Sequence, residues 1–275
     1  MTAAEPSPPR ALRTGLVHEV GSLVAIAQRD LTKLLRDRLR LAVSLALPVA
    51  LILGIGNILQ PTVGRVTGLN AVTLAFTGVL AATLFQSAAA GMISLVEDRD
   101  TDFSRELFVT PVSRLTLVAG KMAGETLVAL CQGVCIVVFA AVIGVSMTLG
   151  QVAAVVGPCL ACCLLGAAFG LATLAALPNQ RSAMQVFEFL ILPQYVLAGV
   201  LVPLRGLAPW LEALSWAMPL RYAVGLTQAA FYAGTPGYHK VVTVNPVVDV
   251  VVMVGLFVAL VVGGTLLLNY RERIR

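Results

Sequence analysis

Long apolar runs separated by short polar segments dominate this chain of 275 residues. A membrane-spanning helix needs about 20 predominantly apolar residues. Six windows meet that requirement, at approximately 41–59, 71–96, 122–145, 152–177, 183–202 and 247–268. Because these runs are continuous and do not alternate as barrel strands do, they predict an all-α polytopic membrane protein with six transmembrane helices in one domain over 41–275.

The segment before the first window divides into a tail and an amphipathic stretch. Residues 1–18 contain three prolines and predict a disordered tail. Over 19–40, apolar residues recur every three or four positions and charged residues fill the remainder, which predicts a helix. We expect this helix to lie in the plane of the membrane interface, because it leads directly into a span. An ordinary soluble amphipathic helix is the alternative.

Basic residues are distributed unevenly between the two sides of the predicted membrane. Fifteen of the 19 Lys and Arg residues lie before the first window, in the loop after the second, just after the fourth or at the C-terminus. Since loops rich in Lys and Arg stay in the cytoplasm, both termini are expected there and the loop over 203–246 outside. The same asymmetry accounts for the net charge of +5, so nucleic acid is not an expected partner.

The first apolar run begins at Leu41 behind a long basic segment, so we interpret it as a signal-anchor span and not as a cleaved signal peptide. Charged residues make up 12% of the chain, against about 25% in soluble domains. Arginine outnumbers lysine 16 to 3, which favours a GC-rich bacterial source. The expected location is therefore the bacterial cytoplasmic (plasma) membrane, with multiple passes.

A charged island over 97–114 lies between the second and third windows. Asp102 is placed to cap a short helix at the start of this island. The apolar face of that helix consists of Phe103, Leu107 and Phe108. Pro111 ends it, because the residue before a proline avoids the α region, and a further helix continues through Arg114 into the third window. A short amphipathic element between two spans is typical of a docking surface for a soluble partner.

The outward loop over 203–246 contains six of the chain's 17 aromatic residues. Its spacing predicts two short helices at about 209–218 and 219–233, which are too short to cross a membrane. Their aromatic residues suit the membrane interface or a re-entrant hairpin that is buried in protein. The residues that define this region are Gly199, Pro203, Pro209, Trp210, Pro219 and Tyr222.

Two polar stripes enter the predicted spans. The residues concerned are Glu125, Gln132, Gln185, Glu188 and Tyr195. The first two share one face of the third window, and the other three share one face of the fifth. An unpaired charge at mid-bilayer costs about 2.5–3.5 kcal/mol on insertion scales, and Lys121 is placed to neutralise Glu125 at i,i+4. The stripes either line a translocation path or make hydrogen bonds between helices and reach the cytoplasmic edge.

Signatures of an enzyme are absent from the sequence. There is no Walker A motif and no metal-spaced histidine pair, so neither a catalytic site nor a metal site is expected. All five cysteines fall in the third and fourth windows, where we expect them to serve as small packing residues. The alternative is metal binding, because Cys131 and Cys135 share a helix face. Glycine pairs at 120/124 and 166/170 permit close helix approach. If transport is driven by ATP, the nucleotide site lies on another polypeptide and this chain binds no cofactor.

Two segments resemble the permease subunits of type-2 ABC exporters, in particular the daunorubicin-resistance-like multidrug and lipid export group. One is Arg105-Glu-Leu-Phe-Val-Thr-Pro-Val-Ser-Arg114, followed by Gly120-Lys121, which is similar to the family's cytoplasmic coupling element. The other is Leu192-Pro-Gln-Tyr-Val-Leu-Ala-Gly199, followed by Val202-Pro203, Leu207-Ala-Pro-Trp210 and Met218-Pro-Leu-Arg-Tyr222, which is similar to the family's late signature. The resemblance extends from about residue 19 to the C-terminus. Asp102 and Ala198 depart from it, since the family commonly has Gly and Ser there.

The resemblance implies a particular assembly. Two permease subunits, identical or paired with a sister chain, sit on two ATP-binding subunits that carry ATP and Mg. Closure of the ATPase then pushes the coupling helix and opens a path between the permeases. The positions that match the coupling element are Phe103, Arg105, Glu106, Leu107, Phe108, Pro111 and Arg114.

The expected function is export of a hydrophobic or amphipathic compound, such as a drug, an antibiotic or a lipid, and so a contribution to efflux and antibiotic resistance. Three alternatives stay open. One is a permease for a polysaccharide or a lipid-linked glycan. Another is a secondary transporter or channel, which predicts inverted repeats; the sequence has no clear internal repeat. The last is a membrane assembly protein that transports nothing.

Overall fold

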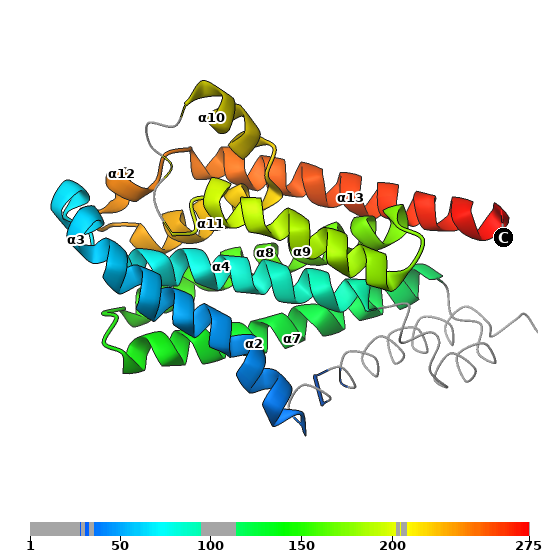
Figure 1. Ribbon diagram of the computed structural model, residues 1–275, viewed down its shortest axis with the longest axis horizontal. Helices are drawn as coiled ribbons and strands as arrows, with labels where there is room; N and C mark the ends of the chain where they lie inside the picture. The colour runs from blue at the N-terminus through cyan, green and yellow to red at the C-terminus, as the bar shows by residue number, and fades with distance from the viewer. Residues whose placement is uncertain are drawn as a thin grey trace, which may run out of the picture.

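The computed structural model describes residues 28, 31–32, 36–94, 114–201, 204 and 208–274. Within those residues every regular element is a helix, which confirms the expected all-α class (Figure 1). The first apolar window forms one continuous rod of three pieces: α2 (Arg38–Ala50), the π-helical η1 (Leu51–Ile55) and α3 (Gly56–Thr67). The other long helices are α4 (Ala71–Ile93), α7 (Arg114–Val142), α8 (Leu149–Ala176), α9 (Gln180–Leu197) and α13 (Pro246–Ile274).

Five helices in the described part of the chain are long and apolar enough to cross a membrane. They cover Leu41–Arg65, Ala71–Ile93, Val118–Val142, Leu149–Ala176 and Pro246–Leu268, in five of the six predicted windows. The first of these helices extends beyond the end of its predicted window at residue 59. The helix continues to Thr67 and ends where Gly68 adopts a φ of +67°, a left-handed conformation that favours glycine at a helix C-terminus.

The fifth predicted window, at 183–202, falls on α9, which is 18 residues long. This helix contains Arg181, Gln185, Glu188 and Gln194, and it is not among the five apolar candidates. The six-span topology therefore stays a prediction. The interfacial helix expected over 19–40 lies mostly outside the described residues and stays a prediction too.

Two short helices occur where the aromatic loop predicts them. α10 (Pro209–Trp216) and α11 (Pro219–Tyr232) each begin with a proline. Proline suits this position because it lacks an N–H, and the first N–H groups of a helix have no hydrogen-bond partner within that helix. The single-turn α12 (Tyr238–Val241) follows before α13 begins. The helices themselves are confirmed, and their re-entry into a membrane stays a prediction.

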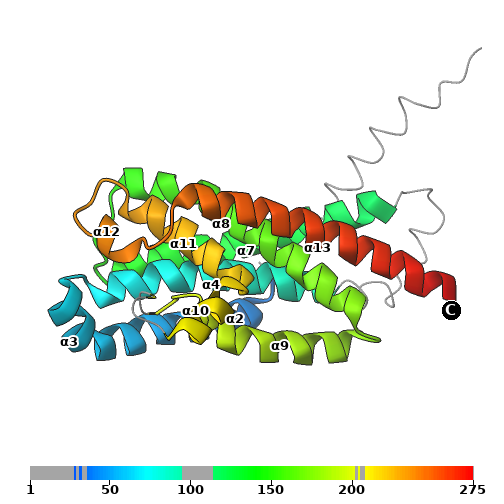
Figure 2. The same cartoon turned by 90° about the horizontal axis from the view of Figure 1, so that it is seen from above.

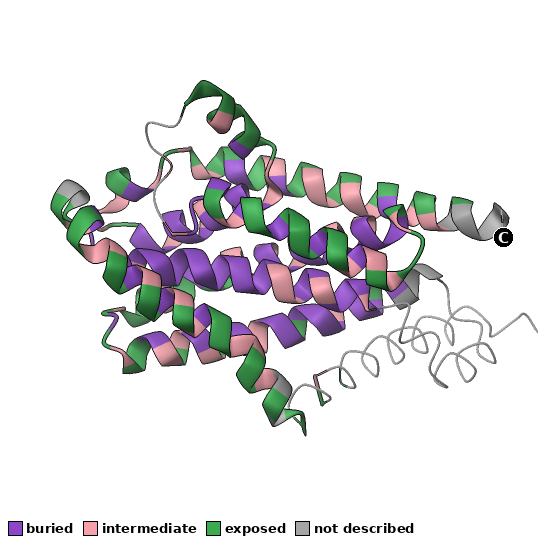
Figure 3. Cartoon of the chain, viewed as in Figure 1, coloured by how far each residue is buried: buried purple, intermediate pink, exposed green. Residues whose placement is uncertain are grey.

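α4 occupies the centre of the bundle and is buried along almost its whole length (Figure 3). Its most extensive contact is with α8. Because Gly166 and Gly170 lack side chains, α8 lies directly against the α4 backbone. A Cβ at either position would lie 2.2 Å from a carbonyl oxygen, that of Phe85 or that of Ala89 respectively. The close approach expected at the 166/170 glycine pair is therefore confirmed.

Successive long helices run in alternating directions along the bundle (Figures 1 and 2). α3, α12 and the start of α4 lie at one end, with α10 and α11 in the same half of the molecule. The C-terminus of α13 lies at the opposite end. We name these the outer end and the inner end, after the predicted topology.

The helices around α4 expose apolar side chains on their outward faces. On α7 and α13 these include Val134, Val138, Val142, Val251, Val254, Val258 and Val262. Lipid tails are as apolar as these side chains, so a surface of this kind suits a bilayer.

Candidate functional site

The expected coupling element occupies the connection between α4 and α7. Phe103, Arg105, Glu106, Leu107, Phe108 and Pro111 lie outside the described residues, and Arg114 is the first residue of α7. The structure therefore places the two ends of this segment, at Ile93 and Arg114. Both ends lie at the inner end of the bundle, where the C-terminus of α13 also lies (Figure 2).

An ion pair lies near this connection, on α7. Nζ of Lys121 lies 2.6 Å from Oε1 of Glu125, and the two side chains are only 5% and 9% exposed. The expected neutralisation of Glu125 by Lys121 is therefore confirmed. The other carboxylate oxygen, Oε2, lies over Gly91 of α4, 1.8 Å from where a Cβ on that glycine would be. Sequence reasoning missed Gly91, because nothing in an apolar run indicates which glycine faces a charge on another helix.

Gln132 lies on the same helix as this ion pair but meets a different neighbour. Its Nε2 donates a hydrogen bond of 3.3 Å to Oγ of Ser44 on α2. The stripe on α7 thus joins that helix to α4 through Glu125 and to α2 through Gln132. These are the interhelical contacts that one of the two sequence interpretations expects; the lining of a path stays a prediction.

The stripe on α9 divides between two environments. Tyr195 is half-buried, and its hydroxyl donates a hydrogen bond of 3.1 Å to Oε1 of Gln86 on α4. Gln185 and Glu188 are exposed on the surface of this single chain. Large apolar side chains are exposed around them, namely Val186, Phe189, Leu190, Leu192 and Val196. α9 therefore has one face that packs on the bundle and another that carries a carboxylate among apolar groups.

Gln194 is a buried connector that sequence reasoning did not single out. It is 2% exposed, and its Oε1 accepts a hydrogen bond of 3.3 Å from the backbone N–H of Leu220 in the first turn of α11. The first N–H groups of a helix have no partner within that helix, so Gln194 satisfies one of them and fastens α11 to α9. The available signal was a glutamine within an apolar run, next to a tyrosine already counted as polar.

Residues of the late signature and the end of α10 form a polar cluster at the outer half of the bundle. Nη1 of Arg221 donates a 2.6 Å hydrogen bond to Oγ of Ser215, which in turn donates to the carbonyl of Leu197. The guanidinium lies 4.0 Å from the centre of the Trp216 ring. Tyr222 donates a 2.6 Å hydrogen bond to the Trp216 carbonyl. Pro219 opens α11 just before this cluster, and Tyr222 belongs to the cluster.

The remaining predicted residues of this region take separate places. Pro209 and Trp210 are exposed on α10, and the tryptophan of the polar cluster is Trp216. Gly199 has a φ of +76° and accepts a 3.3 Å hydrogen bond from Nε2 of Gln228 on α11. Pro203 lies outside the described residues. Residues of the signature therefore connect α9, α10 and α11.

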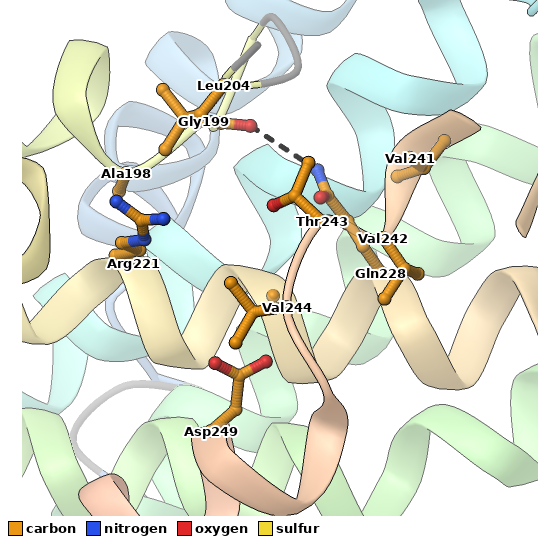
Figure 4. A pocket seen from close by; sticks show the side chains of 11 residues that line it. Ala198, Gly199, Leu204, Arg221, Gln228, Val241, Val242, Thr243, Val244 and Asp249 are labelled. Carbon is orange, nitrogen blue, oxygen red and sulfur yellow. Dashed lines mark hydrogen bonds between the residues drawn. The ribbon is translucent and has the colours of Figure 1, made fainter. Parts of the chain in front are cut away.

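A cavity of about 30 Å³ lies beside this cluster (Figure 4). Arg221, Gln228 and Asp249 line it together with the backbone segment over 241–244. Asp249 is 3% exposed and lies in the first turn of α13, where a helix N-terminus favours a carboxylate. Gly225 leaves room for that carboxylate, since a Cβ there would lie 2.8 Å from Oδ2. The volume holds one or two water molecules and is too small for a cargo compound.

The cysteines pack between helices. Cys159, Cys162 and Cys163 are buried, and Sγ of Cys162 on α8 lies 3.5 Å from Oγ1 of Thr227 on α11. Among the described residues, no group of three or more His, Cys, Asp or Glu residues is arranged to hold a metal ion.

The fold and its polar connectors define a multi-pass helical membrane protein. The family model for the ABC-2 type transporter matches residues 21–232, which is more than half of the chain. The chain therefore belongs to the ABC-2 type transporter family and is an ABC-type permease subunit. Such permeases normally pair with an ATP-binding subunit and are not themselves the ATPase. Comparison with curated protein sequences gives no significant match.

Proposed function

We propose that this permease belongs to an ATP-driven exporter of hydrophobic or amphipathic compounds in the bacterial cytoplasmic membrane. A separate subunit binds ATP and Mg and supplies the energy. The observation that carries the proposal is the family match over 21–232. The α4–α7 pair supports it, because these helices flank the charged segment that resembles a coupling element.

The proposed topology has six spans, with α9 as the fifth. At about 1.5 Å per residue, its 18 residues are about 27 Å long, close to the hydrocarbon thickness of about 30 Å. Gln194 and Tyr195 are polar, but their hydrogen bonds to α11 and α4 lower the cost of placing them in a bilayer. α10 and α11 then form the re-entrant region on the outer side.

The proposed assembly contains two permease subunits that meet at the exposed face of α9. Glu188 lies on that face beside Phe189 and Leu192, which are 74% and 68% exposed. A carboxylate facing lipid is costly, whereas a second permease subunit, identical or related, covers the apolar groups and supplies polar or aqueous surroundings. The cytoplasmic half of this seam is the proposed entry for cargo.

The function is tested with the permease and its ATP-binding subunit reconstituted in lipid vesicles. ATP-dependent movement of a hydrophobic fluorescent drug supports export, and its absence contradicts the proposal. Leu107→Asp is expected to leave insertion and ATP hydrolysis in place but to abolish drug movement, because a charge disrupts the apolar coupling face. Leu107→Met keeps that face apolar and is the matched control.

The topology is tested with single cysteines in a chain whose five native cysteines have been replaced. Lys240→Cys is expected to react with an impermeant thiol reagent added to intact cells. Asp100→Cys is expected to react only after the membrane has been opened. The reverse pattern contradicts the proposed orientation.

A further inference from the structure

Glu125 makes two contacts with different helical surfaces at once. One carboxylate oxygen pairs with Lys121 on its own helix at 2.6 Å. The other lies on Gly91 of α4, and even Cγ of Glu125 lies 2.7 Å from where a Cβ on that glycine would be. The end of the glutamate side chain therefore occupies the space that a side chain at position 91 would need.

The position of this contact in the chain is as informative as its geometry. Gly91 lies in the last turn of α4, and Lys121 and Glu125 lie near the start of the apolar part of α7. The segment that connects the two helices, 94–113, contains the proposed coupling element. The contact thus lies close to the ends of the two helices that flank this element.

The ion pair lies within α7, and its carboxylate end is the part that meets α4. Both charges are almost fully removed from solvent, which costs free energy that close geometry offsets. The pair fixes the glutamate side chain, because moving its carboxylate away from Nζ of Lys121 separates the charges in surroundings of low polarity. The fixed carboxylate fills the space that Gly91 leaves, so a shift of α7 along α4 presses it against α4 residues that carry a Cβ.

α4 is suited to pass a movement on, because it is the central helix. It contacts α8, α7 and α11, and α11 in turn contacts α13. Packed elements of this kind move as rigid bodies and do not deform continuously. A displacement of α7 that moves α4 therefore moves the other helices of the bundle as well.

We propose that the Lys121–Glu125 pair, seated on Gly91, is the joint that passes movement of α7 to α4 during transport. Gly91, Lys121 and Glu125 are positioning residues in this scheme. The inference rests on the proposed function, in which the ATP-binding subunit acts on the segment between these helices. Without the joint, ATP hydrolysis continues while less cargo moves per ATP.

The first test is Gly91→Ala in the reconstituted complex with its ATP-binding subunit. The new methyl group displaces the Glu125 carboxylate and loosens the joint. Transport of the fluorescent drug per ATP hydrolysed is expected to fall about five-fold or more, which is the usual scale of coupling between sites. Gly157→Ala on α8 is the matched control, since a Cβ at that position meets nothing within 4 Å.

The second test asks for compensation between helices. Glu125→Asp shortens the acid by one methylene group and withdraws its outer end, so Gly91→Ala combined with Glu125→Asp is expected to recover part of the lost transport per ATP. Gly91→Ala combined with Lys121→Met leaves the overlap in place and is expected to recover none. If Gly91→Ala does not assemble, Glu125→Gln is tested in its place. This substitution keeps the shape of the side chain, removes its charge and is expected to lower transport per ATP.

Three results overturn the joint. One is a normal ratio of transport to ATP hydrolysis in Gly91→Ala, or in Glu125→Gln if Gly91→Ala does not assemble. Another is equal loss of transport and ATPase activity in the variants that assemble, which indicates a merely structural contact. The third is failure of Glu125→Asp to compensate. A wild-type complex that shows no ATP-dependent transport instead contradicts the proposed function itself, so the two failures are distinguishable.

Discussion

The hydroxyl of Tyr195 on α9 donates a hydrogen bond of 3.1 Å to Oε1 of Gln86 on α4. This bond ties α9, which is not among the five apolar candidates for membrane spans, to α4, which is buried along almost its whole length. Together with the contact between Gln194 and Leu220, it places polar groups of α9 on protein partners. The polar groups on one face of α9 thus have hydrogen-bond partners within the chain, whereas Glu188 on the other face is exposed.

Tyr195→Phe removes the α9–α4 bond and keeps the ring. We expect a loss of stability of about 0.6 kcal/mol and not more than about 1.7 kcal/mol, the range for hydrogen bonds between helices in membranes. Thermal unfolding of the purified permease in lipid nanodiscs measures the change. Gln86→Leu is expected to add little to Tyr195→Phe, because the bond is already lost. Fully additive losses would show that the two side chains do not interact.

Gly166→Ala tests the closest approach of α8 to α4. The added Cβ would lie 2.2 Å from the Phe85 carbonyl oxygen, which belongs to the backbone and does not rotate away. We expect destabilisation at the upper end of the about 1–3 kcal/mol typical of overpacking, with a lower yield of folded protein. Gly157→Ala on the same helix meets nothing within 4 Å and should leave yield and thermal stability unchanged. Equal effects of the two variants would contradict the packing argument.

Arg221→Lys tests the outer polar cluster. Lysine keeps the charge but loses the planar group over Trp216 and the geometry of the bond to Ser215. A desolvated cation over an indole contributes about 2 kcal/mol, so we expect a clear loss of stability. In a Trp210→Phe background, the fluorescence of the remaining Trp216 reports its surroundings and is expected to change. Unchanged emission and unchanged stability would show that the stacking contributes nothing.

Glu188→Gln tests the exposed face of α9. The substitution keeps the shape and removes the charge of a residue that is exposed in the single chain. If the carboxylate faces cargo, export of cationic compounds should fall more than export of neutral ones of similar size, with assembly unchanged. Paired vesicle assays with one cationic and one neutral drug give the comparison. Equal effects on both drugs would leave Glu188 with a packing role alone.

Apolar runs and proline positions predict much of this fold from the sequence. Hydropathy is a property of consecutive residues, so five spans were found in their windows without knowledge of the partners of each helix. The starts of α10 and α11 follow in the same way from Pro209 and Pro219, because a proline favours the first turn of a helix. The pairing of Lys121 with Glu125 was equally predictable, since residues four apart share a helix face.

The helix that each polar side chain meets follows from three-dimensional packing. Glu125 and Gln132 share a face of α7, yet one lies on Gly91 of α4 and the other reaches Ser44 of α2, because the face spans two neighbouring helices. Gln194 and Tyr195 lower the mean hydropathy of α9, although both side chains make hydrogen bonds to residues distant in the sequence. Apolar runs and prolines in the sequence specify the helices and their order. Contacts between residues far apart in the chain determined their partners, since packing depends on three-dimensional neighbours that hydropathy does not encode.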